Sequence, residues 1–137
     1  MILGIGTDIA KVARFKSWQN YSQEQLLKVF SKQELKNCKK NSEYNLEYLA
    51  SRFSAKEAFF KALSQALVKI YLTKKTFTFI FTCQNIEIIK TTWDVPILKI
   101  NWQAFEQIVD QKLSDFKVDL SISHEKEYAV SFVVISN

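Results

Sequence analysis

The sequence NLEYLASRFSAKEAFFKALSQ, residues Asn45 to Gln65, predicts a long helix on which the fold depends. At 3.6 residues per turn its apolar side chains fall on one stripe, as in a helix packed against a core. The stripe comprises Leu46, Leu49, Ala50, Phe53 and Phe60. Glu57 lies within it, four residues after Phe53 and three before Phe60. A carboxylate in such a position costs several kcal/mol unless cations or hydrogen bonds compensate it.

Basic residues surround Glu57 on this predicted helix. Lys61 follows one turn later on the same side, and Arg52 and Lys56 lie around the edge of the stripe. The pattern indicates either a site for a metal ion and an anionic ligand or an internal Glu57–Lys61 ion pair. An ion pair at this i, i+4 spacing stabilises a helix by only a few tenths of a kcal/mol. Both interpretations stay open on the evidence of the helix alone.

Length and composition predict one globular domain over residues 1–137, long enough to bury a core, with 47% apolar residues. The net charge of +5 favours an acidic partner, such as nucleic acid, an anionic protein or a phosphorylated ligand. Cys38 and Cys83 form no C-x-x-C motif and are expected to be reduced. Because no apolar run approaches the ~20 residues that span a bilayer, we expect a soluble, cytoplasmic protein.

The first residues, Met1 to Ile9 (MILGIGTDI), predict a strand. Gly4, Gly6 and Asp8 share one face, whereas Leu3, Ile5 and Ile9 share the other. Two glycines on one face leave a groove where another backbone or a ligand can approach closely. Asp8 then projects from the same face, where it either contributes to a site or caps the following helix.

The rest of the chain alternates between helical and strand patterns. Further helices are expected at Ala10–Asn20, Gln23–Val29, Lys32–Lys39 and Trp102–Leu113, the middle two from capping-box patterns that begin at Ser22 and Ser31. Further strands are expected at Asn85–Lys90, Val95–Asn101, Lys117–His124 and Glu127–Ser136. A loop is expected at Lys39–Asn45. Within Lys69–Asn85, phenylalanines at 77, 79 and 81 alternate with other residues, which predicts a strand that packs inward. The order predicts an α+β domain with a largely antiparallel sheet packed on the long central helix.

Several kinds of active site are poorly supported. The sole histidine, His124, has Ser121 and Ser123 nearby, but the chain has no nucleophile-elbow motif. One histidine and two distant cysteines do not make a zinc site. The Gly4-x-Gly6 pair stops short of a dinucleotide-binding motif, and there is no P-loop.

A hard cation suits the residues that remain. Mg²⁺ typically binds one or two carboxylates, several waters and substrate phosphate oxygens. Asp8 and Glu57 are the candidate carboxylates, and Lys61 and Arg52 would complete a phosphate-binding surface.

Three segments resemble the 4′-phosphopantetheinyl transferase superfamily. GIGTDI at Gly4–Ile9, with Arg14 six residues after the aspartate, is similar to its first signature. RFSAKEAFFKAL at Arg52–Leu63 resembles the second, written around K-E-x-x-x-K. SISHEKEYAVSFVV at Ser121–Val134 resembles the C-terminal segment of the small single-domain branch, the holo-(acyl-carrier-protein) synthases. The order, the spacing and the total length agree with that branch.

The resemblance implies transfer of the 4′-phosphopantetheine arm of coenzyme A to a serine of apo acyl carrier protein, with release of adenosine 3′,5′-bisphosphate. Asp8 and Glu57 would hold Mg²⁺ on the diphosphate, and Glu57 would also help to deprotonate the serine. Lys61 would neutralise charge as the bond breaks. The remaining implied roles are coenzyme A binding by Arg52, Lys56, Lys61 and His124, and carrier-protein binding by Arg14. The family also implies a homotrimer with sites between neighbours.

The chain departs from the family pattern in two places. Family members usually carry glycines just after the second motif, where this chain has Ser64-Gln65-Ala66. They usually carry Gly-Lys-Pro before a later strand, where this chain has Trp93-Asp94-Val95-Pro96. Both regions line the coenzyme A pocket in the family. An alternative is therefore a catalytically impaired homologue that binds carrier protein but has an altered pocket. A second alternative, a basic nucleic-acid-binding domain, is weakened because the lysines are scattered and form no dense patch interleaved with aromatic residues.

Overall fold

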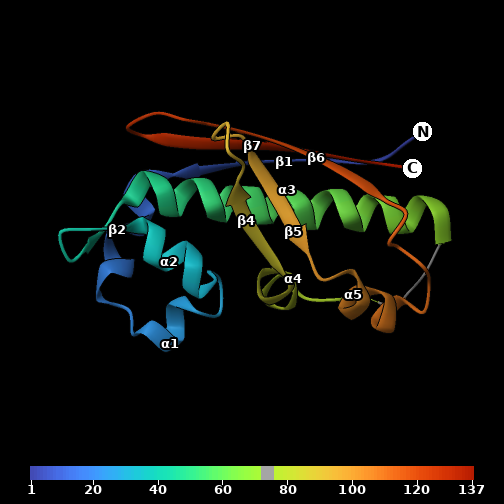
Figure 1. The fold of residues 1–137 in the computed structure, drawn as a ribbon, viewed down its shortest axis with the longest axis horizontal. Helices are drawn as coiled ribbons and strands as arrows, with labels where there is room; N and C mark the ends of the chain where they lie inside the picture. Colours follow the sequence, from blue (N-terminus) through green and yellow to red (C-terminus); the bar gives the residue numbers. More distant parts are fainter. Residues whose placement is uncertain (72–75) are drawn as a thin grey trace.

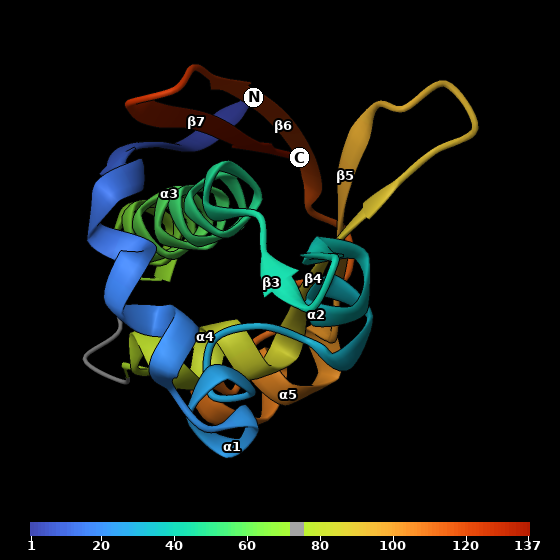
Figure 2. The same cartoon turned by 90° about the vertical axis from the view of Figure 1, so that its left-hand side faces the viewer.

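The computed structural model describes residues 1–71 and 76–137. A three-stranded antiparallel sheet, in the order β1 (Ile2–Lys11), β7 (Tyr128–Ser136) and β6 (Lys117–His124), runs along the central helix α3 (Leu46–Tyr71) (Figure 1). The shorter helices lie on the other side of α3, so that this helix is the middle layer (Figure 2). The predicted α+β architecture with a long central helix is confirmed.

The remaining elements are short. They are η1 (Val12–Asn20, a 3₁₀ helix), α1 (Gln23–Leu26), α2 (Lys32–Cys38), β2 (Lys39–Lys40), β3 (Glu43–Tyr44), α4 (Phe79–Asn85), β4 (Ile86–Lys90), β5 (Pro96–Ile100) and α5 (Trp102–Val109). Both predicted capping boxes form, at Ser22 with Gln25 and at Ser31 with Glu34. Cys38 and Cys83 are buried free thiols. Within the described ranges, no helix combines the length and the apolar character that crossing a membrane requires.

The glycines of β1 let the backbones of β1 and α3 meet. A Cβ atom on Gly4 would overlap the carbonyl oxygen of Ala62, and one on Gly6 would overlap that of Ala58. Beside this contact, where β7 packs on α3, the buried hydroxyls of Ser54 on α3 and Ser131 on β7 are 2.6 Å apart. The predicted groove therefore exists, and the group that enters it is the backbone of α3.

The single apolar stripe predicted for α3 is wrong, because the helix is covered on nearly every side. Ala55, Lys56 and Ala58 are fully buried although they lie outside that stripe, since the sheet and the short helices cover opposite sides of α3. Glu57 and Phe60, by contrast, are only partly buried. Glu57 thus lies at the edge of the covered surface, not in the middle of an apolar face.

The predicted faces of β1 are also partly wrong. A bulge between Ile2 and Gly4 turns Leu3 inward, where it is buried with the glycines. Ile5 and Ile9 remain exposed on the opposite face. Exposed Val130 and Phe132 continue this apolar surface on β7, because Ile9 pairs with Val130 in the sheet. We call Ile5, Ile9, Val130 and Phe132 the outer sheet face.

The strand expected in Lys69–Asn85 is wrong where the structure describes it. Residues up to Tyr71 continue α3, residues 72–75 lie outside the described ranges, and Phe79–Asn85 forms α4. Thr78 begins α4 because its hydroxyl accepts a hydrogen bond from the Phe81 amide. The phenylalanines still pack inward: Phe77, for example, has its ring centroid 5.1 Å from that of Phe105.

Two other expected segments differ in detail. The loop expected at Lys39–Asn45 contains the two-residue strands β2 and β3, with Asn41 and Ser42 at positive φ in the turn between them. The helix expected from Ala10 begins only at Val12, because β1 continues to Lys11 and pairs there with Tyr128.

Candidate active site

The candidate site lies where β1 passes beside the middle of α3. The Lys61 ammonium donates to Asp8 Oδ1 at 3.0 Å and to the carbonyl oxygen of Thr7 at 3.1 Å. The carboxylate that Lys61 contacts is therefore Asp8, more than fifty residues away in the chain, and not Glu57 as an internal helix pair would require.

Glu57 completes a compact group of charges at this position. Burial raises the pKa of Glu57, and the negative charge of Asp8 raises it further, whereas the nearby cations Lys61 and Arg14 lower it. The like charge of Asp8 acts on Glu57 because strand and helix bring the two acids together. The structure thus gathers four of the predicted residues: Asp8, Arg14, Glu57 and Lys61.

Arg14 reaches this group from η1 by stacking on aromatic side chains. Its guanidinium carbon lies 4.7 Å from the ring centroid of Phe53 and 5.9 Å from that of Phe15. Cation–π contacts of this kind hold an arginine in place while its polar edge stays free for other partners. Arg14 is exposed, so it can meet a partner molecule as well as influence Glu57.

Lys56, which the resemblance assigned to coenzyme A, is not part of this site. Its side chain is fully buried, and the ammonium donates to Glu34 Oε1 and the Val29 carbonyl oxygen, both at 2.7 Å. It also donates to the carbonyl oxygens of Cys83 and Ile86, each at 3.3 Å. These protein acceptors and the complete burial leave no route from the ammonium to a dissolved ligand.

Sequence reasoning missed Glu34, the partner of Lys56. Its carboxylate also accepts hydrogen bonds from the Ser31 amide at 2.7 Å and the Ile88 amide at 3.0 Å. The capping box identified Glu34 as a helix-terminal residue, but its second oxygen and its burial depend on β4. The ion pair therefore joins α2, α3 and β4 in one buried network.

Arg52 lies in the N-terminal half of α3, and His124 is the last residue of β6. Arg52 is 6% exposed, and its guanidinium carbon stacks 3.8 Å from the ring centroid of Tyr48. Among the described residues its Nε has no hydrogen-bond partner. His124 Nδ1 is 3.1 Å from Glu47 Oε2. Because Glu47 precedes Glu57 by ten residues, the helical rise places the two about 15 Å apart along the axis.

The two segments that lack the family glycines, Ser64–Ala66 and Trp93–Pro96, lie in α3 and in the β4–β5 turn. Ser64-Gln65-Ala66 continues α3, which runs on to Tyr71. In the β4–β5 turn, exposed Trp93 precedes Asp94, which adopts a positive φ of 58° without being glycine.

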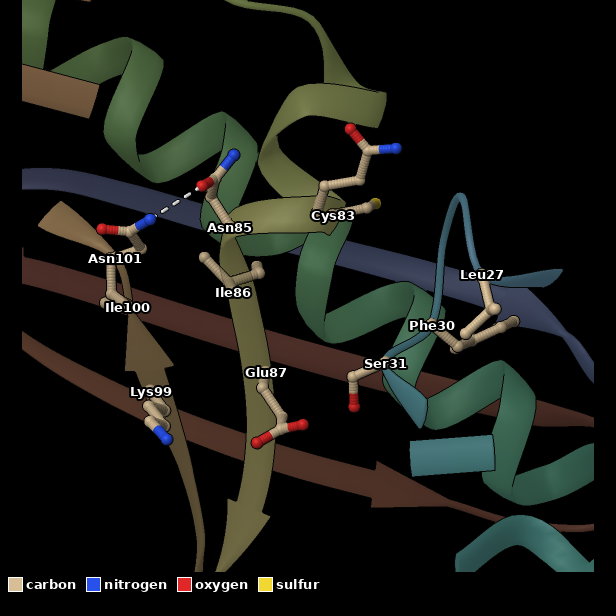
Figure 3. Close-up of a pocket in the computed structure, with 11 residues that line it drawn as sticks. Leu27, Phe30, Ser31, Cys83, Asn85, Ile86, Glu87, Lys99, Ile100 and Asn101 are labelled. Carbon is tan, nitrogen blue, oxygen red and sulfur yellow. Dashed lines mark hydrogen bonds between the residues drawn. The ribbon is translucent and has the colours of Figure 1, made fainter. Parts of the chain in front are cut away.

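A separate cleft of about 550 Å³ lies between α4, the β4–β5 hairpin and the residues just before α2 (Figure 3). At one end the amide of Asn101 donates to the side-chain oxygen of Asn85 at 3.0 Å. Glu87 and Lys99, which pair across β4 and β5, line another part. The cleft contains none of the predicted site residues.

The class of this protein follows from its fold and from its match to a known family. The model of the 4′-phosphopantetheinyl transferase superfamily matches residues 4–133, and the chain belongs to that superfamily. It is 34% identical to the holo-[acyl-carrier-protein] synthase of Borrelia turicatae, with all of both chains covered. It is 36% identical to the synthase of Wolbachia pipientis subsp. Culex pipiens, with 98% of each chain covered. The family resemblance drawn from the sequence motifs is confirmed.

Solved structures agree with this assignment. The complex of the Chronobacterium ammoniagenes synthase with CoA superposes with a TM-score of 0.77 at 25% identity, covering 97% of this chain and 96% of that chain. The Helicobacter pylori synthase in complex with coenzyme A has a TM-score of 0.66 at 28% identity, covering 96% of this chain and 99% of that chain.

Replacing Lys56 tests its structural role. We expect Lys56→Met to lower the free energy of unfolding by about 3–5 kcal/mol, because the Glu34 carboxylate would stay buried without its cation. Adding Glu34→Gln should recover part of this loss, because the buried charge is then absent. Urea denaturation measures both changes, and Lys28→Met, at an exposed lysine, is the control. A Lys56→Met variant that keeps wild-type stability but shows a raised KM for coenzyme A would restore the ligand-binding role.

Glu57 should destabilise the metal-free protein. Its pKa is raised on folding, so the ionised form disfavours the folded state at pH values above that pKa, and protonation removes the penalty as the pH falls. Glu57→Gln should therefore raise the thermal midpoint at neutral pH, and the difference from wild type should shrink in acid. Thermal unfolding across pH in chelator checks this, with Glu125→Gln as an exposed control. A variant no more stable than wild type at neutral pH would contradict it.

Proposed function

We propose that this chain, acting as one domain over residues 1–137, transfers the 4′-phosphopantetheine group of coenzyme A to a serine of an apo acyl carrier protein. Adenosine 3′,5′-bisphosphate is the second product, and Mg²⁺ is the metal. The observation that carries the proposal is the meeting of Asp8, Glu57 and Lys61 across β1 and α3. Membership of the superfamily and the names of the relatives support the same reaction.

The two acids fit a divalent cation. Burial and the like charge of Asp8 both raise the pKa of Glu57, and a cation bound by the two carboxylates would offset both effects. In the part of the chain that the structure describes, no group of three or more histidine, cysteine or acidic side chains gathers for a metal. Mg²⁺ does not need one, because water and substrate phosphate oxygens complete its coordination. When bound, the ion would neutralise charge on the diphosphate oxygens.

The protein groups then have distinct tasks. The serine oxygen forms a bond to the phosphorus that carries the pantetheine arm, and the bond from that phosphorus to the bridging oxygen breaks. Lys61 neutralises the charge that develops on the departing phosphate. Glu57 takes the serine proton directly or through water.

Arg52 and His124 are assigned to the nucleotide end of coenzyme A. This assignment follows the family resemblance, and the contact with the Tyr48 ring holds the Arg52 guanidinium in place.

Arg14 is assigned to the carrier protein. Lys11 and Lys16 are exposed on either side of it in the sequence, and the chain carries a net charge of +5. An acidic carrier would be attracted to this segment before docking, which raises the rate of association more than the final affinity.

The outer sheet face supports the homotrimer that the family implies. Ile5 and Ile9 are 44% and 63% exposed on β1, and Val130 and Phe132 are 40% and 44% exposed on β7. Neighbouring apolar side chains of this kind mark contact surfaces more often than solvent-facing ones. We assign this face to contacts between copies of the chain.

Mass spectrometry of an apo carrier protein incubated with coenzyme A and Mg²⁺ tests the reaction. The carrier should gain the mass of the phosphopantetheine group. Asp8→Asn, Glu57→Gln and Lys61→Met should each slow the gain about 100-fold or more, because each removes charge from the transition state. Glu125→Gln should behave as wild type. Full turnover by Glu57→Gln at saturating Mg²⁺ would refute the role given to Glu57.

Phe132→Lys tests the outer sheet face. A charge placed there should be costly to bury between copies, so the variant should be smaller than wild type by light scattering after size exclusion. Ile97→Lys on β5 is a matched control, because Ile97 is 42% exposed and Phe132 is 44% exposed. A wild-type protein that is monomeric, or a Phe132→Lys variant of unchanged mass, would contradict the assignment.

A further inference from the structure

The open edge of β1 is held by side chains of α3. β1 is an end strand of its sheet, so one of its edges has no neighbouring strand among residues 1–71 and 76–137. Such an edge presents unpaired amide and carbonyl groups. Lys61 donates to the Thr7 carbonyl at 3.1 Å, Gln65 accepts from the Ile5 amide at 2.7 Å, and Lys69 donates to the Ile2 carbonyl at 2.8 Å.

The spacing of these three contacts follows from the geometry of helix and strand. Lys61, Gln65 and Lys69 are four residues apart, which is a rise of about 6 Å per step on a helix. Two residues of a strand advance by about 6.7 Å, so successive helix residues meet alternate strand residues. Thr7 and Ile5 fit this match, and the bulge at Leu3 makes Ile2 the next outward residue.

These hydrogen bonds add to the β7 ladder and the glycine contacts in opposing a slide of β1 along α3. The contacts of Gly4 and Gly6 set how closely strand and helix approach, but van der Waals contact has little direction. Hydrogen bonds have narrow limits of distance and angle. Gln65 is central in the row, and its side chain has one rotatable bond fewer than those of the two lysines that flank it.

We propose that Gln65 is a positioning residue for the metal site. Holding Ile5 keeps Thr7 and Asp8 in register with Lys61 and Glu57, so that the two carboxylates meet before the metal arrives. This inference rests on the proposed function, in which Asp8 and Glu57 bind Mg²⁺. Gln65 itself contacts the strand and takes no part in the chemistry.

Hydrogen exchange and Mg²⁺ titration of the full chain test the proposal. In Gln65→Met the Ile5 amide should exchange about tenfold faster, the effect of losing one hydrogen bond of ordinary strength. The Gly6 amide faces β7 in the alternating ladder and should keep its rate. The Mg²⁺ concentration for half-maximal activity should rise severalfold, while the KM for carrier protein stays at its wild-type value.

One further variant tests for rescue of the contact, and a second serves as a control. Gln65→Glu should restore both measurements, because a carboxylate also accepts the Ile5 amide and lies one turn from both Lys61 and Lys69. Gln107→Met replaces an exposed glutamine of α5 and should change neither. Rescue by Gln65→Glu separates positioning from a general loss of stability.

Two outcomes would overturn the inference. Unchanged Ile5 exchange in Gln65→Met would show that the contact is not formed, and faster exchange with unchanged Mg²⁺ dependence would show that it does not act on the metal site. The proposed function fails differently: Asp8→Asn would keep wild-type Mg²⁺-dependent turnover, whatever Gln65→Met does to the exchange of Ile5.

Discussion

The structure depends on direct contact between the backbones of β1 and α3. Any side chain at Gly4 or Gly6 would occupy the space of the helix carbonyls of Ala62 and Ala58. The contact puts a strand and a helix at a separation that short charged side chains can span. Asp8, near the end of β1, can therefore reach Lys61 and influence Glu57 without a long loop to carry it.

The opposite side of α3 is held by a buried ion pair. Lys56 and Glu34 are both removed from water, which is unfavourable for each charge alone, but backbone carbonyls and amides satisfy the bonds left over. The adjacent residues Lys56 and Glu57 thus have opposite environments. Lys56 points toward the short helices and holds α3 in its orientation. Glu57 therefore lies at the edge that faces β1 and Arg14.

The candidate site contains an unfavourable electrostatic interaction between Asp8 and Glu57. Burial of Glu57 and the like charge of Asp8 both disfavour its ionised form and raise its pKa. Functional sites commonly carry such strain, which the surrounding structure stabilises until a ligand relieves it. In this protein the contact between β1 and α3 and the buried Lys56–Glu34 ion pair stabilise the site.

Much of this protein follows from its sequence alone. The capping boxes and the glycine spacing express local preferences, so they identified the starts of α1 and α2 and the close approach of another group to β1. The motifs identified the family. They also singled out Asp8, Glu57 and Lys61 as candidate site residues. Local pattern failed at Phe77–Phe81, where alternation predicted a strand, because the Thr78 cap and packing on the core favour a helix. Only the tertiary structure decided that Lys56 is buried while Glu57 and Lys61 face β1. Adjacent helix residues point in different directions, and which direction is covered depends on elements distant in the chain.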